Sequence, residues 1–498
     1  MDTLASLLSG FAIALTPQNL LFAFIGSLIG TAVGVLPGIG PIAGISILLP
    51  LTFKLDATGA IIMLSAIYYG AMYGGTITTV LINVPGEGAS AVTALDGHAM
   101  AKQGRAGPAL AIAAIGSFIG GTLATVTLVV AAPLLSGVAL SFGPPEFFAL
   151  MLLGLVLVVG FSGGPPLLGL LSAALGLALA LPGIDIVEGT PRLTFGLPDL
   201  VDGISFVPVI MGLYGVGEIL TAMERRATVP QRPLPIGRIT LSREDIRESA
   251  GPIARGTVLG TFLGLIPGIG TILPTVASYA IEKRLSRTPE RFGKGAIAGV
   301  AGPETTNNAY ANGALIPLFT LGVPASPTIA VLLGGFMMQG LTPGPFLFQE
   351  KPDFVWAVIA SLYVGNVMLL VLNLPFVGLW VRLLRIPEGI LFPLVLLFTL
   401  VGAYVTRNSL FDVWLLIGFG VVGWLCRKIG FPVAPMAFTL ILGPLTENAL
   451  RQALSMSGGE LDVLVRSNIA MVLLAAAALA FAVPILLALR DALRRRRG

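Results

Sequence analysis

Apolar runs of about 20 residues recur along the whole chain, separated by short polar segments. A helix of that length can cross a bilayer. The pattern predicts an all-α polytopic membrane protein, because a soluble protein with buried helices would not need so many such runs. The expected apolar helices cover residues 19–36, 42–53, 57–84, 107–135, 146–161, 165–181, 204–223, 256–266, 271–281, 315–321, 354–379, 389–404, 410–425, 433–445 and 469–489.

The sequence Pro-Gly-Ile-Gly interrupts two of these runs, at 37–40 and at 267–270. Proline removes a backbone donor and glycine adds conformational freedom, so each copy should end one helix and start another. A charged loop, a segment rich in Gly, Thr or Asn, and a Val-Pro break follow both copies in the same order. This order predicts an internal repeat. The predicted units are a first half 1–223 with its core at 19–106, a basic cytoplasmic linker 224–255, and a second half 256–498 with its core at 256–345.

Loop charges predict that the two copies have opposite orientations in the membrane. The loop after the first Pro-Gly-Ile-Gly is nearly neutral, whereas its counterpart at 283–294 contains five Lys or Arg residues. Conversely, Lys102 and Arg105 follow the first Val-Pro break, whereas Glu350, Lys351 and Asp353 follow the second. Because positive loops face the cytoplasm, we expect inverted repeats. Each Pro-Gly-Ile-Gly then lies in a re-entrant hairpin, and about eleven segments cross the bilayer.

Composition excludes several other classes. Charged residues make up 11% of the chain, against about 25% in soluble domains. The net charge of +4 does not indicate nucleic-acid binding, since the basic residues lie in short loops. The single cysteine, Cys426, excludes an internal disulfide and a cysteine metal cluster. No phosphate-binding loop, H-E-x-x-H or G-x-S-x-G motif occurs, and no cleaved signal peptide is expected. We therefore do not expect an enzyme.

Polar residues near the breaks indicate a binding site. A helix that starts inside the membrane directs free N–H groups toward an anion, and exposed carbonyl ends favour a cation such as Na⁺. Glu87 and Glu304 are the carboxylates closest to the breaks. A charge at that depth is costly and indicates function, unless the side chain lies in water at the interface. The neighbouring Asn, Thr and Ser residues either contribute to the site or form hydrogen bonds between helices.

Five motifs resemble the large membrane subunit of the bacterial tripartite tricarboxylate transporter family, and the resemblance covers nearly the whole chain. They are Gly-x-Leu-Pro-Gly-Ile-Gly at 34–40, Tyr-Tyr-Gly-Ala-Met-Tyr-Gly-Gly-Thr at 68–76, Asn-Val-Pro-Gly-Glu at 83–87, Gly-Pro-Glu-Thr-Thr-Asn-Asn-Ala at 302–309 and Leu-Gly-Val-Pro-Ala-Ser at 321–326.

The resemblance implies a multi-pass protein of the bacterial inner membrane. It would act with a small four-helix membrane subunit and a periplasmic solute-binding protein. It would import citrate or other di- and tricarboxylates, driven by a gradient of Na⁺ or H⁺ without an organic cofactor. Na⁺ is expected near the Pro-Gly-Ile-Gly breaks, with no ligands assigned.

No catalytic residue is expected. The motifs and the polar chemistry together predict a substrate and ion site formed by Pro37, Gly38, Ile39, Gly40, Gly75, Thr76, Asn83, Gly86, Glu87, Gly88, Ala89, Ser90, Pro267, Gly268, Gly270, Glu304, Thr305, Thr306, Asn307, Asn308, Pro324, Ala325 and Ser326.

Two other functions fit a protein of this class. A channel, or a scaffold subunit without coupled transport, would give no response to collapse of the Na⁺ and H⁺ gradients. A membrane-embedded enzyme would give chemically altered products in proteoliposomes.

Overall fold

The computed structural model describes residues 3–36, 40–162, 164–185, 188–224, 233–384, 386 and 388–495. Within these ranges the chain is mainly α-helical, with one short antiparallel pair of strands. Seven described helices are long and apolar enough to cross a membrane by length and composition, and six further apolar helices are shorter. The prediction of an all-α polytopic membrane protein is therefore confirmed, whereas the inverted orientation and the eleven crossings stay predictions.

The first half contains α1 (Thr3–Ala14), α2 (Pro17–Val35), α3 (Gly40–Leu48), η1 (Leu49–Lys54), α4 (Ala57–Ile82), η2 (Ala89–Ala91), α5 (Ala94–Lys102), α6 (Ala106–Ala139), α7 (Pro144–Gly160), α8 (Pro166–Ala180), β1 (Gly183–Ile184), β2 (Pro191–Arg192), η3 (Pro198–Leu200), α9 (Phe206–Ile210), η4 (Met211–Val216) and α10 (Gly217–Glu224).

The second half contains α11 (Arg243–Gly264), α12 (Ile272–Leu285), η5 (Pro289–Arg291), α13 (Ala298–Gly313), α14 (Leu315–Leu321), α15 (Pro327–Met338), α16 (Leu347–Glu350), α17 (Pro352–Asn373), α18 (Val377–Leu383), α19 (Glu388–Arg407), α20 (Leu410–Lys428), α21 (Ala434–Met456), α22 (Val463–Arg466) and α23 (Asn468–Arg495).

Several helix boundaries differ from the sequence prediction, and two of the differences have a clear local cause. Helix α11 begins at Arg243, inside the segment expected to be a linker, because Ser242 and Asp245 cap its first turn reciprocally. The single helix expected over 354–379 divides into α17 and α18 around Pro375. Proline disfavours helical backbone in the residue before it and cannot donate a helical hydrogen bond, which accounts for the division.

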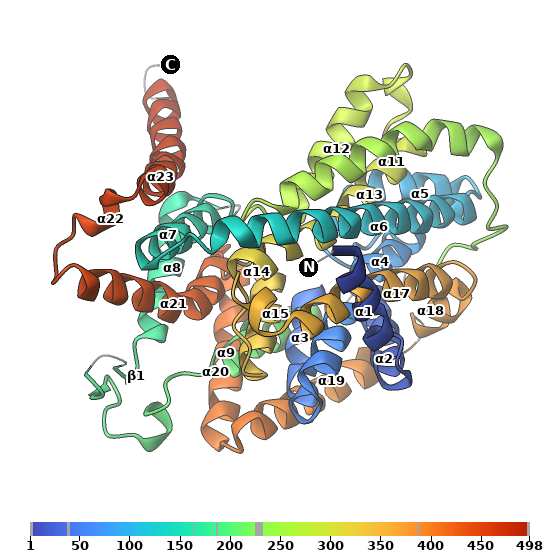
Figure 1. The fold of residues 1–498 in the computed structure, drawn as a ribbon. Helices are drawn as coiled ribbons and strands as arrows, with labels where there is room; N and C mark the ends of the chain where they lie inside the picture. The colour runs from blue at the N-terminus through green and yellow to red at the C-terminus, as the bar shows by residue number, and fades with distance from the viewer. Residues whose placement is uncertain are drawn as a thin grey trace.

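Helix α4 lies at the centre of the fold and is buried along its length, whereas α6, α19 and α20 expose much of their apolar surface. Helices α2, α6, α13, α15 and α17 contact α4. Figure 1 shows α6 crossing the middle of the molecule, with α7, α8, α21 and α23 gathered at one side. A buried centre with apolar outer helices is the arrangement expected of a protein surrounded by lipid.

Glycines allow two helix pairs to approach each other closely. Gly26, Gly30 and Gly34 of α2 face α4, and a methyl group at Gly30 would lie 2.5 Å from the carbonyl oxygen of Ile67. In the second half, glycines with the same four-residue spacing bring α11 against α13. They are Gly256, Gly260 and Gly264. Small residues at this spacing promote close helix packing in membranes. Both helix pairs therefore pack closely through glycines spaced four residues apart.

A buried carboxylate connects the charged loops of the two halves. Asp96 on α5 accepts hydrogen bonds from the backbone N–H groups of Gly293, Gly295 and Ala296 at 2.8–2.9 Å, and from the Tyr279 hydroxyl at 2.8 Å. Two ion pairs join the same region to α11. They are Arg105–Asp245 and Arg291–Glu248. The loops around 102, 245 and 291 therefore lie on one side of the molecule.

We expect Gly30→Ala and Gly260→Ala to destabilise the fold by about 1–3 kcal/mol each, the usual cost of overpacking. At Gly260 the added methyl would lie 2.3 Å from the carbonyl oxygen of Thr306. The measurement is the midpoint of thermal unfolding in detergent. Gly418→Ala is the matched control, because an added methyl there meets nothing within 4 Å. Equal midpoints for all three variants would contradict the glycine-packing interpretation.

Candidate functional site

The second Pro-Gly-Ile-Gly separates two helices. Helix α11 ends at Gly264 and α12 begins at Ile272, and Gly268 and Gly270 adopt φ values of 82° and 71°. These values require glycine, because L side chains rarely adopt left-handed backbone. The N–H of Gly268 donates to the carbonyl oxygen of Ala325 at 3.0 Å. A backbone group released at this break is thus satisfied by the Val-Pro break of the same half.

The first Pro-Gly-Ile-Gly also coincides with a change of helix. Helix α2 ends at Val35, and α3 begins at Gly40, whose φ is 63°. Pro37, Gly38 and Ile39 lie outside the described residues. The second described break of this half comes after α4, where Asn83 adopts a left-handed conformation with φ of 56°. Gly322 ends α14 in the same way, with φ of 70°.

The segment from Gly86 to Gly88 brings the broken regions of the two halves together. A methyl group at Gly86 would lie 2.1 Å from the carbonyl oxygen of Gly34, near the end of α2, and 2.6 Å from the Cα atom of Gly75. A methyl group at Gly88 would lie 2.9 Å from Cδ1 of Ile272, the first residue of α12. Both glycines therefore sit where a side chain would obstruct the contact.

Glu304 on α13 binds hydroxyl groups of the first half. Its two carboxyl oxygens accept hydrogen bonds from Thr76 of α4 at 2.5 Å and from Thr93 at 2.6 Å. Only 1% of Glu304 is exposed. The alternative that this side chain lies in water at the interface is therefore wrong, since hydroxyl groups replace water as its donors.

Glu87 forms the reciprocal contact from the first half to the second. Its Oε1 atom accepts a hydrogen bond from Nδ2 of Asn307 at 2.5 Å, and only 7% of the residue is exposed. Ser90 donates to the backbone oxygen of Glu87 and accepts from Thr79. The interface alternative fails for Glu87 as well, because the side chain is enclosed by both halves.

Two acceptors in this region have no donor. Among the residues that the structure describes, the side-chain oxygens of Asn307 and Asn308 accept no hydrogen bond, although both are buried. The amide of Asn308 donates to Ser117 of α6 at 2.7 Å. Unsatisfied buried oxygens are uncommon in proteins and are costly. They mark a place where a cation or a donor group could bind.

The remaining predicted residues divide into three groups. Asn83 is exposed at the end of α4 and does not reach the buried carboxylates. Thr305 and Thr306 donate to carbonyls of their own helix and lie where α13 packs on the glycines of α6 and α11. The others form the backbone of the breaks themselves. These are Gly40, Ala89, Pro267, Gly270, Pro324, Ala325 and Ser326, of which Ser326 caps α15 through Ile329 N–H.

Sequence reasoning missed two residues that contact Glu304. Thr93 donates to its carboxylate, and Ser117 donates to its backbone oxygen at 3.3 Å. Thr93 follows the Val-Pro break by a few residues, so its proximity to the motif was an available signal. Ser117 lies in an ordinary apolar helix among Ala and Gly, and nothing in its local sequence distinguishes it.

A small cavity lies at one edge of the polar cluster. It is lined by Tyr73, Thr76, Ser117 and their neighbours and measures about 10 Å³, which is at the limit for a single water molecule. This cavity is too small for a carboxylate substrate.

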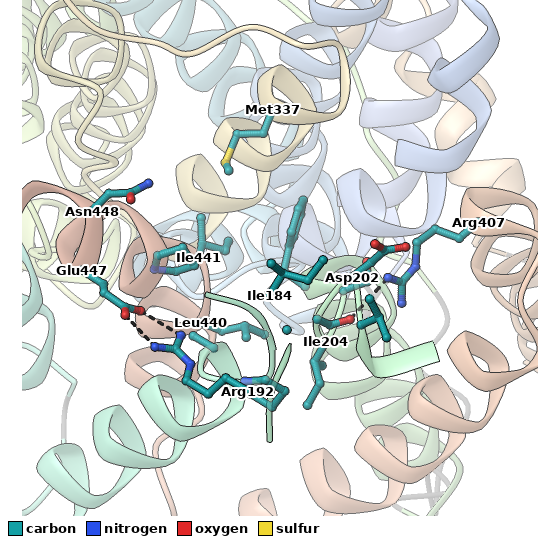
Figure 2. A pocket seen from close by; sticks show the side chains of 18 of the residues that line it. Ile184, Arg192, Asp202, Ile204, Met337, Arg407, Leu440, Ile441, Glu447 and Asn448 are labelled. Carbon is teal, nitrogen blue, oxygen red and sulfur yellow. Dashed lines mark hydrogen bonds and ion pairs between the residues drawn. The ribbon is translucent and has the colours of Figure 1, made fainter. Parts of the chain in front are cut away.

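A larger pocket of about 460 Å³ lies away from the breaks, between the β1–β2 hairpin and α21 (Figure 2). Its arginines are paired with acids: Arg192 contacts Glu447 at 2.7 Å, and Arg407 contacts Asp412 at 2.6 Å. Hydrogen bonds from Arg192 lower the pKa of Glu447 below its ordinary value. Because these charges are neutralised, the pocket is not arranged to hold an anion in this conformation.

Comparisons with known proteins agree with the motifs. A family model described as "Tripartite tricarboxylate transporter TctA family" matches residues 20–438. A protein of Agrobacterium vitis, "Uncharacterized 52.8 kDa protein in TAR-I ttuC' 3'region", is 48% identical over 475 residues, covering 95% of each chain. A second A. vitis protein, "Uncharacterized protein in TAR-II ttuC' 3'region", is 46% identical over 215 residues, covering 43% of this chain and 89% of that protein.

No solved structure matches the chain. The long family match and the full-length similarity lead to the same conclusion as the apolar helices and the breaks between them: this chain belongs to the TctA family of tripartite tricarboxylate transporters.

Proposed function

We propose that this chain is the translocating subunit of an ion-coupled importer for di- and tricarboxylates such as citrate. The observation that carries the proposal is the buried cluster in which Glu87 contacts Asn307 and Glu304 contacts Thr76 and Thr93. Residues from both halves are required to form it, and it lies beside interrupted helices. Binding sites of secondary transporters are typically formed at such an interface.

The charges in the cluster require a coupling cation. Two buried carboxylates would repel an anionic substrate, and no Lys or Arg forms an ion pair with either one in the described part of the chain. A proton on a carboxyl group, or Na⁺ bound by carboxylate and amide oxygens, would remove this repulsion. The side-chain oxygen of Asn307 accepts no hydrogen bond, and the amide of this residue contacts Glu87, so the oxygen is available as a ligand for Na⁺. Cation binding would thereby permit carboxylate binding, which couples the two fluxes.

We infer that the two halves are inverted repeats. Loops predicted to be cytoplasmic contact one another, as Asp96 does with 293–296 and Glu224 with Lys428. Loops predicted to be periplasmic also meet, as Gln339 does with Thr52. This separation of loops into two groups supports the topology inferred from charge. In that topology α2–α3 is a hairpin that enters and leaves the membrane on the periplasmic side, and α11–α12 is a hairpin that enters and leaves on the cytoplasmic side.

The family context supplies the proposed partners. In a tripartite system of the bacterial inner membrane, a periplasmic binding protein would deliver the carboxylate and a small four-helix subunit would complete the membrane assembly. A channel or a scaffold without coupled transport is the alternative function. Uptake that persists unchanged when both ion gradients are collapsed would favour that alternative.

Glu304→Gln should lower uptake about a hundredfold, the rate equivalent of about 3 kcal/mol, because the amide cannot carry the charge that a cation compensates. The assay is uptake of labelled carboxylates into vesicles with purified binding protein under imposed Na⁺ or pH gradients. Glu350→Gln is the control and should transport normally, because Glu350 is an exposed residue at the end of α16. Wild-type uptake by Glu304→Gln would remove this residue from the site.

Glu87 and Asn307 should be energetically coupled across the two halves. A double-mutant cycle with Glu87→Gln and Asn307→Ala should give a coupling of about 0.5–3 kcal/mol in substrate or Na⁺ affinity, the range for residues in direct contact. Affinities can be measured by calorimetry on the detergent-solubilised complex. Strictly additive effects would show that the 2.5 Å contact is not part of the binding site.

Cysteine labelling should place the two charged loops on opposite sides of the membrane. In a Cys426→Ser background, which removes the single native cysteine, Arg287→Cys should react only with a reagent that reaches the cytoplasm. Asp353→Cys should react only from the periplasm. Both positions are exposed. Labelling of both from the same side would reject the inverted topology.

A further inference from the structure

An apolar groove of about 650 Å³ runs between α6 and α11, away from the polar cluster. Helix α6 is one of the candidate membrane spans, and Leu123 on its groove face is 47% exposed, so this face meets the lipid phase. The α11 side remains apolar beyond the groove, with Phe262 62% exposed. The groove is lined on α6 by Ile112, Ile119 and Leu123 and on α11 by Ala250, Ala254 and Val258.

Two arginines precede the groove-lining residues Ala250, Ala254 and Val258 on the same face of α11. Arg243 and Arg247 precede Ala250 by seven and three residues, spacings that place them on the same helical face. Both are exposed, and neither forms an ion pair with any residue that the structure describes. By contrast, the neighbouring acids Asp245 and Glu248 are neutralised by Arg105 and Arg291. Glu244, which lies between the two arginines in the sequence, is exposed and forms no ion pair with a described residue, so Arg243, Glu244 and Arg247 together give this end of the groove one net positive charge.

We propose that this groove binds an anionic phospholipid, with the phosphate at Arg243 and Arg247 and an acyl chain along α6 and α11. Basic pockets next to membrane helices bind anionic headgroups, and a guanidinium matches a phosphate in charge and geometry. Ser242 already caps the first turn of α11, so the phosphate is held by side chains and not by the helix end. This site depends on membrane insertion and is independent of the transport proposal.

The length and the lining of the groove suit an acyl chain. The groove follows α6 from Ile112 to Leu123, about 17 Å at the helical rise per residue. Every lining residue except Thr257 is apolar, so the groove can bury a hydrocarbon chain without leaving polar groups unsatisfied. The charge at one end and the apolar lining along its length therefore match a headgroup and its acyl chain.

The test measures phospholipid retention by native mass spectrometry of the full chain, with phosphatidylglycerol and phosphatidylcholine as probes. Wild type should retain phosphatidylglycerol preferentially. Arg243→Gln with Arg247→Gln should weaken that binding roughly thirtyfold, from the usual contribution of two basic residues at a membrane surface. Arg284→Gln with Arg287→Gln is the matched control, because both arginines are exposed and lie elsewhere on the same side. The control should bind like wild type.

A second variant tests the acyl-chain part of the site. Ala254→Phe places a large side chain in the groove at an exposed position, so the fold should be preserved while phosphatidylglycerol binding is reduced at least tenfold. Equal retention of the two lipids by wild type, equal loss in the control pair, or unchanged binding by Ala254→Phe would each overturn the proposal. So would exclusion of phosphatidylglycerol from the complex assembled with the small membrane subunit, since a partner helix would then occupy the groove.

Discussion

A main chain that leaves a helix inside a membrane protein must find hydrogen-bond partners within the protein, because lipid offers none. The structure satisfies this constraint by placing one break against another. The Gly268 N–H binds the carbonyl of Ala325, and the carbonyl of Gly34 lies against Gly86. Glycine is needed at both positions, because a side chain at Gly86 would clash with the carbonyl oxygen of Gly34, and one at Gly268 would clash with the backbone of Leu157 and Val158 on α7. These contacts hold the break before α12 against the segment that precedes α15, and the end of α2 against the segment 86–88.

The same constraint explains why a polar helix can occupy the centre of an apolar protein. Helix α13 contains Glu304, Asn307 and Asn308, and the side chain of each forms a hydrogen bond with a residue of the first half. Burial of a polar group is tolerated when hydrogen bonds replace water. The cost that remains is concentrated at the unsatisfied amide oxygens and the carboxylates. The proposed function assigns these groups to the coupling ion.

Much of this arrangement could be predicted from sequence. The lengths of the apolar runs predicted most of the helices, because a helix that crosses a membrane needs a minimum number of consecutive apolar residues. The Pro-Gly-Ile-Gly at 267–270 predicted a break that the structure contains, since its glycines require left-handed backbone. Glu87 and Glu304 were selected because carboxylates are rare at such positions, and both are buried beside partners from the other half.

Other features depended on tertiary packing, which local sequence does not encode. The run 302–309 contains adjacent Glu, Thr and Asn residues, but the helical period directs Glu304 and Asn307 to the first half and turns Thr305 and Thr306 toward packing contacts. Only the fold distinguishes these faces. Thr93 and Ser117 were missed for the same reason, since their importance comes from the position of Glu304. The start of α11 at Arg243 could have been predicted from the capping box of Ser242 and Asp245, but the many arginines around it favoured the interpretation as a linker.

The anchoring of Asp96 has a mechanical consequence for the cluster. Thr93, which holds Glu304, lies three residues before Asp96, and that carboxylate is bound to four donors of the second half. The first turn of α5 therefore holds both the buried glutamate, through Thr93, and the loop 293–296, through Asp96. A movement of this turn away from the second half would break both sets of contacts together, so the position of the loop is coupled to the hydrogen bonding of the buried carboxylate.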